Sequence, residues 1–225
     1  MGLCLKNECA AMSEHQNHSP IDEGVVKFDA SDFEKTGPLP SHAIEKMEAV
    51  RRALFEKALI GEYPDIQIGY GNLSQRNPNE NGFLISGTQT GHLPHLSGQH
   101  YTAVTAFDIG KNSVSVKGPI QASSESLTHA ALYASHDNIR VVIHVHSLCI
   151  WQGMLKEGLP HTAKDIPYGT PAMANAVKAI VQNNSHGVLA MAGHEEGVIT
   201  FGENWPQALN LCLDLYDRFT LANSE

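Results

Sequence analysis

The segment Val141-Val142-Ile143-His144-Val145-His146 constrains the fold more than any other part of the sequence. Its run of apolar residues suits a strand buried within a sheet. Because side chains two residues apart on a strand point to the same face, His144 and His146 are expected to lie side by side. Two neutral imidazoles in such a place leave ring nitrogens unsatisfied unless a metal ion or hydrogen-bond partners accept them. The pattern alone leaves two interpretations open with about equal weight: a metal site, or a hydrogen-bonded pair of core histidines.

Composition restricts the partners of the chain. A chain of 225 residues, 42% of them hydrophobic, can bury one core, so a single α/β domain is expected. The formal charge of -9 favours neither nucleic acid nor an anionic membrane surface, and small molecules are the expected partners. No apolar run approaches the roughly 18 residues of a membrane span, and charged residues such as Lys6 and Glu8 interrupt the start of the chain, so we expect a cytoplasmic protein. The cysteines form no Cys-x-x-Cys pair, which argues against a thiolate zinc site.

Two regions of the chain differ in their pattern. Residues 1–40 mix polar, acidic and proline-bearing stretches without sustained periodicity, which predicts a flexible N-terminal arm followed by one domain over residues 41–225. Apolar residues near helical spacing predict a helix from Ser41 to about Gly61. Later segments alternate between strand and helix patterns, and the sequential hairpins among them predict an antiparallel sheet. The further expected strands are Gly82–Ser86, Tyr101–Phe107, Ser113–Lys117, Arg140–His146, Gly187–Ala192 and Gly197–Phe201, and the further expected helices are Ser123–Ser135, one from Pro171 and one from about Asn204.

Ser123-Ser124-Glu125 lies at the expected start of the helix that precedes the histidine strand. In a first helical turn, free backbone N–H groups and the two hydroxyls would form an anion site suited to a substrate phosphate or carboxylate. Serine as an N-cap and glutamate in a first turn are also what any helix prefers, and taken alone the motif favours that ordinary interpretation. The neighbouring histidine strand makes a functional role for Glu125 the stronger hypothesis.

A catalytic zinc site needs a third protein ligand and an open position. Of the 13 histidines, His194 is the first candidate, because it stands in a turn between two expected strands, where functional residues are commonly carried. His129 competes with it, since it follows Glu125 by four residues on the same helix face. His129 equally fits a core histidine or an outer partner of a metal ligand.

Four motifs in this order resemble the class II aldolase/adducin family. Gly69-Tyr70-Gly71-Asn72-Leu73-Ser74 is similar to the family's first phosphate loop, and Ile85-Ser86-Gly87-Thr88 is similar to its second. Ser123-Ser124-Glu125 matches the family's Ser-Ser-acid motif, and His144-Val145-His146 follows at family spacing. The resemblance runs from about Ser41 to Phe219. The order of four motifs is much more specific than a His-x-His alone.

The resemblance implies a single three-layer α/β domain, with a central, mainly antiparallel sheet flanked by helices, assembled as a homotetramer with sites at subunit interfaces. It implies a zinc-dependent aldolase, a lyase that cleaves or forms a C–C bond in a small sugar phosphate or related hydroxy-carbonyl compound through an enediolate. Histidine ligands also accept Mn²⁺, Fe²⁺ or Co²⁺. The implied roles are zinc ligation by His144, His146 and His194, acid/base catalysis by Glu125, and contact with the substrate's anionic group by Asn72, Thr88, Ser123 and Ser124.

Other activities remain open within the resemblance. A 4-epimerase, dehydratase or decarboxylase would use the same apparatus, and a non-catalytic adducin-like interaction domain would keep the fold without the metal. Glu125 favours the aldolase, because the epimerases have Asp at this position.

Two segments depart from the family pattern. The third ligand usually stands in a His-Gly pair, whereas this chain has His194-Glu195-Glu196-Gly197, as though two residues were inserted. The segment Gly158–Gly169 is short compared with that of fuculose-phosphate aldolase, which supplies a catalytic tyrosine. That tyrosine is left unassigned.

Overall fold

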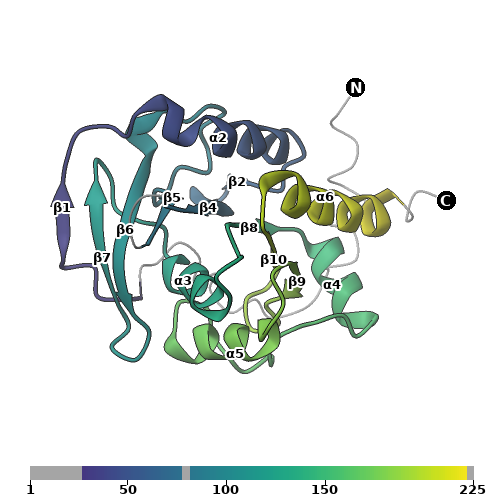
Figure 1. Ribbon diagram of the computed structural model, residues 1–225. Helices are drawn as coiled ribbons and strands as arrows, with labels where there is room; N and C mark the ends of the chain where they lie inside the picture. The colour runs from purple at the N-terminus through teal and green to yellow at the C-terminus, as the bar shows by residue number, and fades with distance from the viewer. Residues whose placement is uncertain (1–26, 78–81, 222–225) are drawn as a thin grey trace.

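The computed structural model describes residues 27–77 and 82–221, which form three layers: a central sheet with helices on both faces (Figure 1). Within these residues, none of the helices has the length and apolar character to cross a membrane. The strands are β1 (Phe33–Lys35), β2 (Gly61–Tyr63), β3 (Ile68–Tyr70), β4 (Asn72–Arg76), β5 (Phe83–Ser86), β6 (Tyr101–Asp108), β7 (Ser113–Gly118), β8 (Val141–His146), β9 (Gly187–Ala190) and β10 (Gly197–Gly202). The helices are α2 (Ser41–Glu56), the 3-10 helix η1 (Gly98–His100), α3 (Ser126–Ser135), α4 (Leu148–Lys156), α5 (Pro171–Val181), α6 (Trp205–Tyr216) and the π-helical η2 (Asp217–Leu221).

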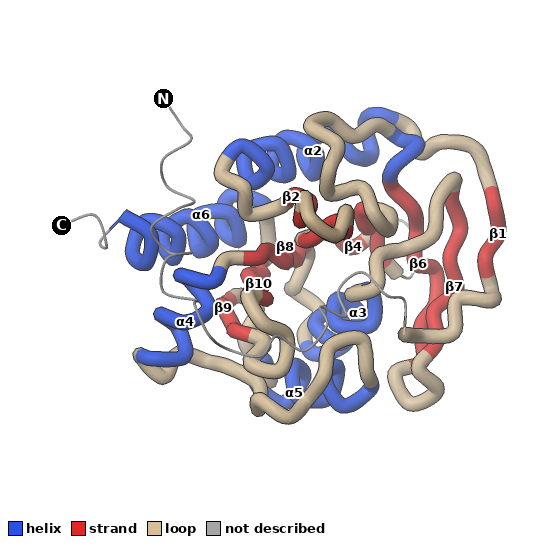
Figure 2. Tube along the Cα trace, turned by 180° about the vertical axis from the view of Figure 1, so that it is seen from behind, coloured by secondary structure: helices blue, strands red, loops and turns tan. Residues whose placement is uncertain are grey.

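The described part of the chain contains an eight-stranded sheet in the order β1-β7-β6-β5-β4-β8-β10-β9, and a separate pair of β2 and β3. Neighbours in the large sheet are antiparallel except for β1, which runs parallel to β7. The expected three-layer α/β domain with a mainly antiparallel sheet is therefore confirmed. Strand β8 lies between β4 and β10 at the middle of the molecule (Figure 2).

The two faces of the sheet pack against different helices, because alternate residues of each strand point in opposite directions. Ile143 and Val145 of β8 join the apolar cluster formed with α2, α4 and α6. Val142, on the other face, joins the cluster formed with α3 and α5. Figure 1 shows α2 and α6 on one side of the sheet and α3 and α5 on the other. His144 and His146 share the face of Val142, so they point toward the layer of α3 and α5.

Strand β1 falls inside residues 1–40, where we expected a flexible arm. Asp29 forms an isolated bridge with Ser113, and the Val116 N–H donates to the Asp32 carbonyl, so this stretch extends the sheet at its edge. The short polar segment carries no apolar alternation that would have indicated a strand, and its backbone pairs with a neighbour distant in sequence. Residues 1–26 of the expected arm lie outside the described residues.

The limits of two helices differ from the sequence expectation, and a third helix was not expected at all. Helix α2 ends at Glu56 rather than near Gly61, because Ala58 adopts φ 56° and the chain turns there. Helix α3 begins at Ser126, after a turn over Ser123–Glu125 in which the Ser126 N–H donates to the Ser123 carbonyl. Helix α4 was not expected; its N-terminus is capped by the Ser147 hydroxyl, which accepts from the Ile150 N–H.

Candidate metal centre and anion pocket

Three histidines converge on the α3–α5 face of the sheet. His144 and His146 project from β8, and His194 comes from the turn between β9 and β10. The Nε2 atom of His146 lies 3.1 Å from that of His144 and 3.0 Å from that of His194. All three side chains are buried, with exposed fractions of 1–4%. Within the described residues, this cluster is a group whose ligand atoms lie close enough together to hold a metal ion.

The turn that carries His194 is held by backbone contacts. The His194 N–H donates to the Met191 carbonyl, and the Gly197 N–H donates to the His194 carbonyl. Gly193 packs against Ile166 so closely that an added Cβ would lie 1.9 Å from its carbonyl oxygen, so a side chain cannot be accommodated there. The ring of Tyr168 stands edge-on to His194, with centroids 4.5 Å apart. These contacts fix His194 against β8 although it is distant in sequence.

Hydrogen bonds behind the cluster assign the proton positions of two imidazoles. His144 Nδ1 lies 3.2 Å from the Val198 carbonyl oxygen, which can only accept, so Nδ1 carries the proton. His146 Nδ1 lies 2.9 Å from the Tyr63 hydroxyl, whose single proton is donated to Glu196 Oε2 at 2.7 Å, so His146 Nδ1 is also the donor. Both Nε2 atoms therefore present lone pairs to the centre of the cluster.

This donor set fits a bound metal. Lone pairs on Nε2 of His144 and His146, facing His194, are the kind of ligand atoms that a zinc ion binds. Zn–N bonds of about 2.0–2.1 Å in a tetrahedral site put ligand nitrogens about 3.3 Å apart, close to the observed spacing. Burial, followed by the neighbouring rings of His146, His194 and His129, holds the pKa of His144 well below its usual value, which favours the neutral, metal-binding form.

Glu125 lies beside this cluster. It occupies the N-cap position of α3, directly before the helix rather than in its first turn as expected. Its side chain is 1% exposed, and Oε1 lies 3.7 Å from His194 Nδ1. The carboxylate of Glu125 is therefore buried beside His194, one of the three clustered imidazoles.

The four residues expected to bind an anion share one small pocket. Asn72, Thr88, Ser123 and Ser124 line it, together with a glycine-rich set of backbone: Gly69, Gly71, Gly87, Gln89, Thr90 and Gly91. Asn72 pairs with His144 across β4 and β8, so the pocket adjoins the histidine cluster. Asn72 is 7% exposed, and its Oδ1 has no hydrogen-bond partner among the described residues. The turn before α3 adds Ser123 and Ser124, whose hydroxyls can hydrogen-bond an anionic group.

The pocket wall is held from behind by a buried arginine. Arg51, on α2, is 1% exposed, and its guanidinium donates to the carbonyls of Thr90 and Gly91, each at 3.2 Å. Burial lowers the pKa of Arg51 from its usual value. The guanidinium also donates to the Pro94 carbonyl at 3.4 Å, and a buried cation with three carbonyl partners fixes the loop conformation that faces the pocket.

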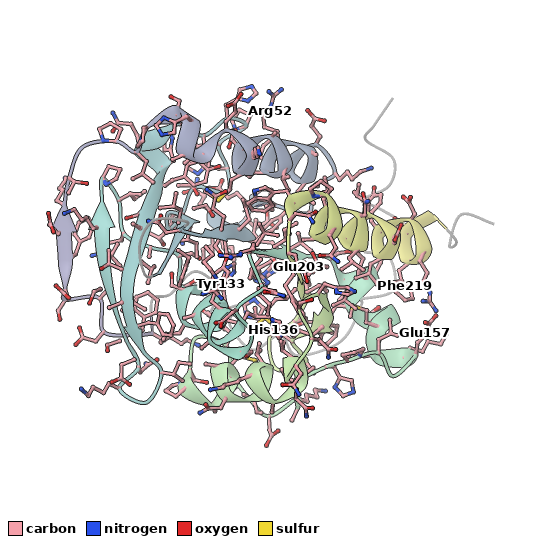
Figure 3. The ribbon with its side chains drawn as sticks, in the orientation of Figure 1. Arg52, Tyr133, His136, Glu157, Glu203 and Phe219 are labelled. Atoms are coloured by element: carbon pink, nitrogen blue, oxygen red, sulfur yellow. The ribbon has the colours of Figure 1, made fainter. Side chains whose placement is uncertain are left out.

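His129 does not join the histidine cluster. Its Nδ1 lies 2.7 Å from the Ser74 hydroxyl, which also contacts the Tyr133 hydroxyl at 2.7 Å. Tyr133 extends from α3 and is labelled in Figure 3. Burial lowers the pKa of His129 to about 3, so the ring is neutral. The structure thus brings His194, and not the competing His129, to the two histidines of β8.

Sequence reasoning missed the residues that support the site from behind. Tyr63 and Glu196 are 133 positions apart, and no local pattern connects them. Arg51 resembles any polar residue of an amphipathic helix until its burial is known. Tyr168 lies within Gly158–Gly169, the segment already noted as unusual, and this was the one available signal.

The comparisons with known proteins agree with this fold. The model of the Class II Aldolase and Adducin N-terminal domain matches residues 59–221, and the chain belongs to that family. A search of curated proteins finds no match.

Solved structures show the same fold at low sequence identity. L-fuculose-1-phosphate aldolase from Thermus thermophilus is 19% identical, with a TM-score of 0.60 over 82% of this chain and 93% of that one. YgbL from Escherichia coli, a proposed aldolase/epimerase/decarboxylase, is 21% identical, with a TM-score of 0.60 over 80% of this chain and 88% of that one. A sugar-phosphate aldolase from Thermotoga maritima is 13% identical, with a TM-score of 0.59 over 82% of this chain and 97% of that one.

Proposed function

We propose that this protein is a zinc-dependent aldolase-type lyase, which cleaves or forms a C–C bond in a small sugar phosphate or related hydroxy-carbonyl compound. The observation that carries the proposal is the convergence of three buried histidines, one of which, His194, lies beside the carboxylate of Glu125. Membership of the class II aldolase and adducin family supports it. Mn²⁺, Fe²⁺ or Co²⁺ would also suit three imidazoles.

In this proposal, His144, His146 and His194 hold the metal and leave room for substrate oxygens. When bound, the metal acts as a Lewis acid for the negative charge that develops on oxygen as a bond next to a carbonyl breaks. Glu125 transfers the proton to or from the reacting carbon. Its burial excludes bulk water from this step, and its position before α3 fixes it relative to His194.

Asn72, Thr88, Ser123 and Ser124 would anchor the anionic end of the substrate. The pocket adjoins His144 through the pairing of β4 with β8, so an anion held there places the rest of a small molecule against the histidines and Glu125. Such anchoring contributes to catalysis by fixing the reacting carbons before bond cleavage.

Two further candidates use the same fold. An epimerase, dehydratase or decarboxylase needs the same anchoring and proton transfer, and Glu125 in place of Asp favours the aldolase over the epimerase. A non-catalytic, adducin-like interaction domain would not need three converging imidazoles. We also propose that residues 41–225 form the catalytic domain, with β1 as an added edge strand, and that it works in the cytoplasm as a homotetramer with sites at subunit interfaces.

The test combines metal content with activity. Zinc per chain is measured for the wild type, for His144→Ala, and for His95→Ala as a control, because His95 is exposed. Aldol cleavage is assayed over a panel of ketose 1-phosphates. One zinc per chain that is lost in His144→Ala and kept in His95→Ala, with metal-dependent cleavage, supports the proposal. Zinc without cleavage indicates one of the related reactions: epimerisation, dehydration or decarboxylation. Absence of any bound metal contradicts the proposal that the protein is a metal-dependent enzyme.

A further inference from the structure

We propose that Tyr63 and Glu196 are positioning residues that hold His146 in the orientation and protonation state in which it binds the metal. This inference rests on the proposed metal site and extends it to two side chains outside the ligand set. Neither belongs to the motifs that the chain shares with the class II aldolases. Glu196 is one of the two residues by which this chain departs from the family's His-Gly pattern.

The three groups form a chain of contacts that ends at the cluster. The Tyr63 hydroxyl donates to Glu196 Oε2 at 2.7 Å and lies 2.9 Å from His146 Nδ1, while the same carboxylate oxygen is 4.0 Å from that nitrogen. A phenol has one proton, and an ionised carboxylate can only accept. The phenol oxygen therefore accepts the His146 Nδ1 proton, which leaves the lone pair on Nε2, the atom that faces His144 and His194.

The backbone at Glu196 supports a specific role for its side chain. Glu196 has φ 66°, in the left-handed region, which disfavours any residue except glycine. It is fixed there because its carbonyl accepts from the Ser147 N–H, and because the following Gly197 pairs with His146 across β10 and β8. A glycine would occupy this position without strain, but it would lack the carboxylate that reaches Tyr63.

Tyr63 is held in place on its own strand. It ends β2, and its ring packs against Tyr70 with centroids 4.6 Å apart and against the edge of His146 at 6.2 Å. The Glu196 side chain remains 29% exposed, so its carboxylate keeps contact with water while its oxygen bonds the phenol. The hydrogen-bonded relay from Glu196 through Tyr63 to His146 therefore connects a partly exposed carboxylate to a buried imidazole through one aromatic side chain.

An outer hydrogen bond of this kind fixes the ring orientation of a metal-binding histidine and increases the basicity of its ligating nitrogen. The corresponding partner of His144 is a backbone carbonyl, which substitution cannot remove. His146 has side-chain partners instead, so its outer contact can be tested by mutation. Loss of such a partner typically weakens metal binding by about 10–100-fold.

The experiment measures the zinc affinity of the full-length protein by competition with a chromogenic chelator. The variants are Tyr63→Phe, Glu196→Gln and the double variant, with Glu195→Gln as a matched control on the exposed neighbour. We expect zinc to bind about 10–100-fold more weakly in each single variant. The double variant should lose no more zinc affinity than the more affected single variant, because Glu196 acts on His146 through Tyr63 and the two losses should not add. Glu195→Gln should bind zinc as the wild type does.

A fourth variant separates positioning from a merely structural role. Glu196→Gly removes the carboxylate and also relieves the strained φ, so the metal-free protein should melt at the same or a higher temperature while zinc binds more weakly. A merely structural role for Glu196 predicts that the melting temperature and the zinc affinity of Glu196→Gly fall together, and that result would overturn the proposal. Wild-type zinc affinity in Tyr63→Phe and Glu196→Gln, with zinc lost in His146→Ala, would also overturn it and leave the metal site intact. A wild-type protein that binds no zinc would contradict the metal site itself and the relay with it.

Discussion

The two faces of strand β8 are equally buried but differ in chemistry. Ile143 and Val145 pack into the apolar cluster under α2, α4 and α6, where they contribute to stability through close packing and buried apolar area. His144 and His146, on the opposite face, meet His194 and adjoin a pocket of hydroxyl, amide and glycine backbone groups. If the polar face performs the proposed chemistry, substitutions on the two faces should affect different measurements: stability on the apolar face, and metal binding or activity on the polar face.

The largest expected effect lies on the polar face, at Glu125. Glu125→Gln keeps the shape but removes proton transfer, so kcat should fall by roughly 10²–10⁴-fold, the usual contribution of a general acid or base. The zinc content and the unfolding free energy of the variant should remain close to those of the wild type. Steady-state kinetics with the best ketose 1-phosphate measures the loss, and Glu195→Gln, on an exposed residue, is the control. An unchanged kcat would remove Glu125 from the mechanism.

On the apolar face, Ile143→Ala should affect stability and leave the metal in place. Ile143 is fully buried, and truncation of such a side chain costs about 2–5 kcal/mol of unfolding free energy. Urea denaturation of the metal-free protein measures this loss, and metal analysis should still find one zinc per folded chain. Two results would contradict this difference between the faces. One is that folded Ile143→Ala binds no zinc, and the other is that His144→Ala lowers the unfolding free energy of the metal-free chain as much as Ile143→Ala does.

His129 tests whether a buried histidine on the polar face can be purely structural. Its pKa of about 3 in the folded state lies below the usual 6.5, so below pH 6.5 the unfolded chain takes up a proton that the folded chain does not. Stability is thus lost as the pH falls from 6.5 toward 3. Between pH 6.5 and 4.5 the metal-free wild type should lose about 2–3 kcal/mol more than His129→Gln, which does not titrate.

Urea denaturation at several pH values measures this difference for His129. His95→Gln, a substitution at an exposed histidine, serves as the control. Parallel pH profiles for the wild type and His129→Gln would mean that His129 takes up its proton in the folded protein.

The smallest effect is expected in the anion pocket. Ser124→Ala removes one hydroxyl from the pocket lining, so KM for a ketose 1-phosphate should rise by about tenfold with little change in kcat, as expected for loss of a hydrogen bond to a charged group. The same ketose without its phosphate should show no such rise. An equal rise for both compounds would place the phosphate elsewhere.

The sequence predicted the features that depend on local periodicity. The alternation in Val141–His146 placed His144 and His146 on one face, and the turn between two strands indicated His194. The structure also brings Asn72, Thr88, Ser123 and Ser124 to one pocket, as their motifs predicted. Their roles as ligands and substrate contacts stay predictions.

Contacts between segments distant in the chain could not be predicted from local sequence patterns. Glu125 sits before α3 because the turn at Ser123 closes on itself, a detail of backbone hydrogen bonding that N-terminal helix preferences do not determine. Strand β1 exists because β7 offers an open edge to a polar segment. The link from Tyr63 to Glu196 depends on where β2 and the β9–β10 turn meet in space, and neither residue belongs to a local pattern.

The most direct test of the central claim is X-ray absorption at the zinc edge of the purified wild-type protein. Three histidine nitrogens at about 2.0–2.1 Å, without sulfur, are predicted for a site made by His144, His146 and His194. His194→Ala should lower the number of imidazole ligands by one or abolish binding. A zinc–sulfur distance of about 2.3 Å, or a zinc environment unchanged in His194→Ala, would contradict this site.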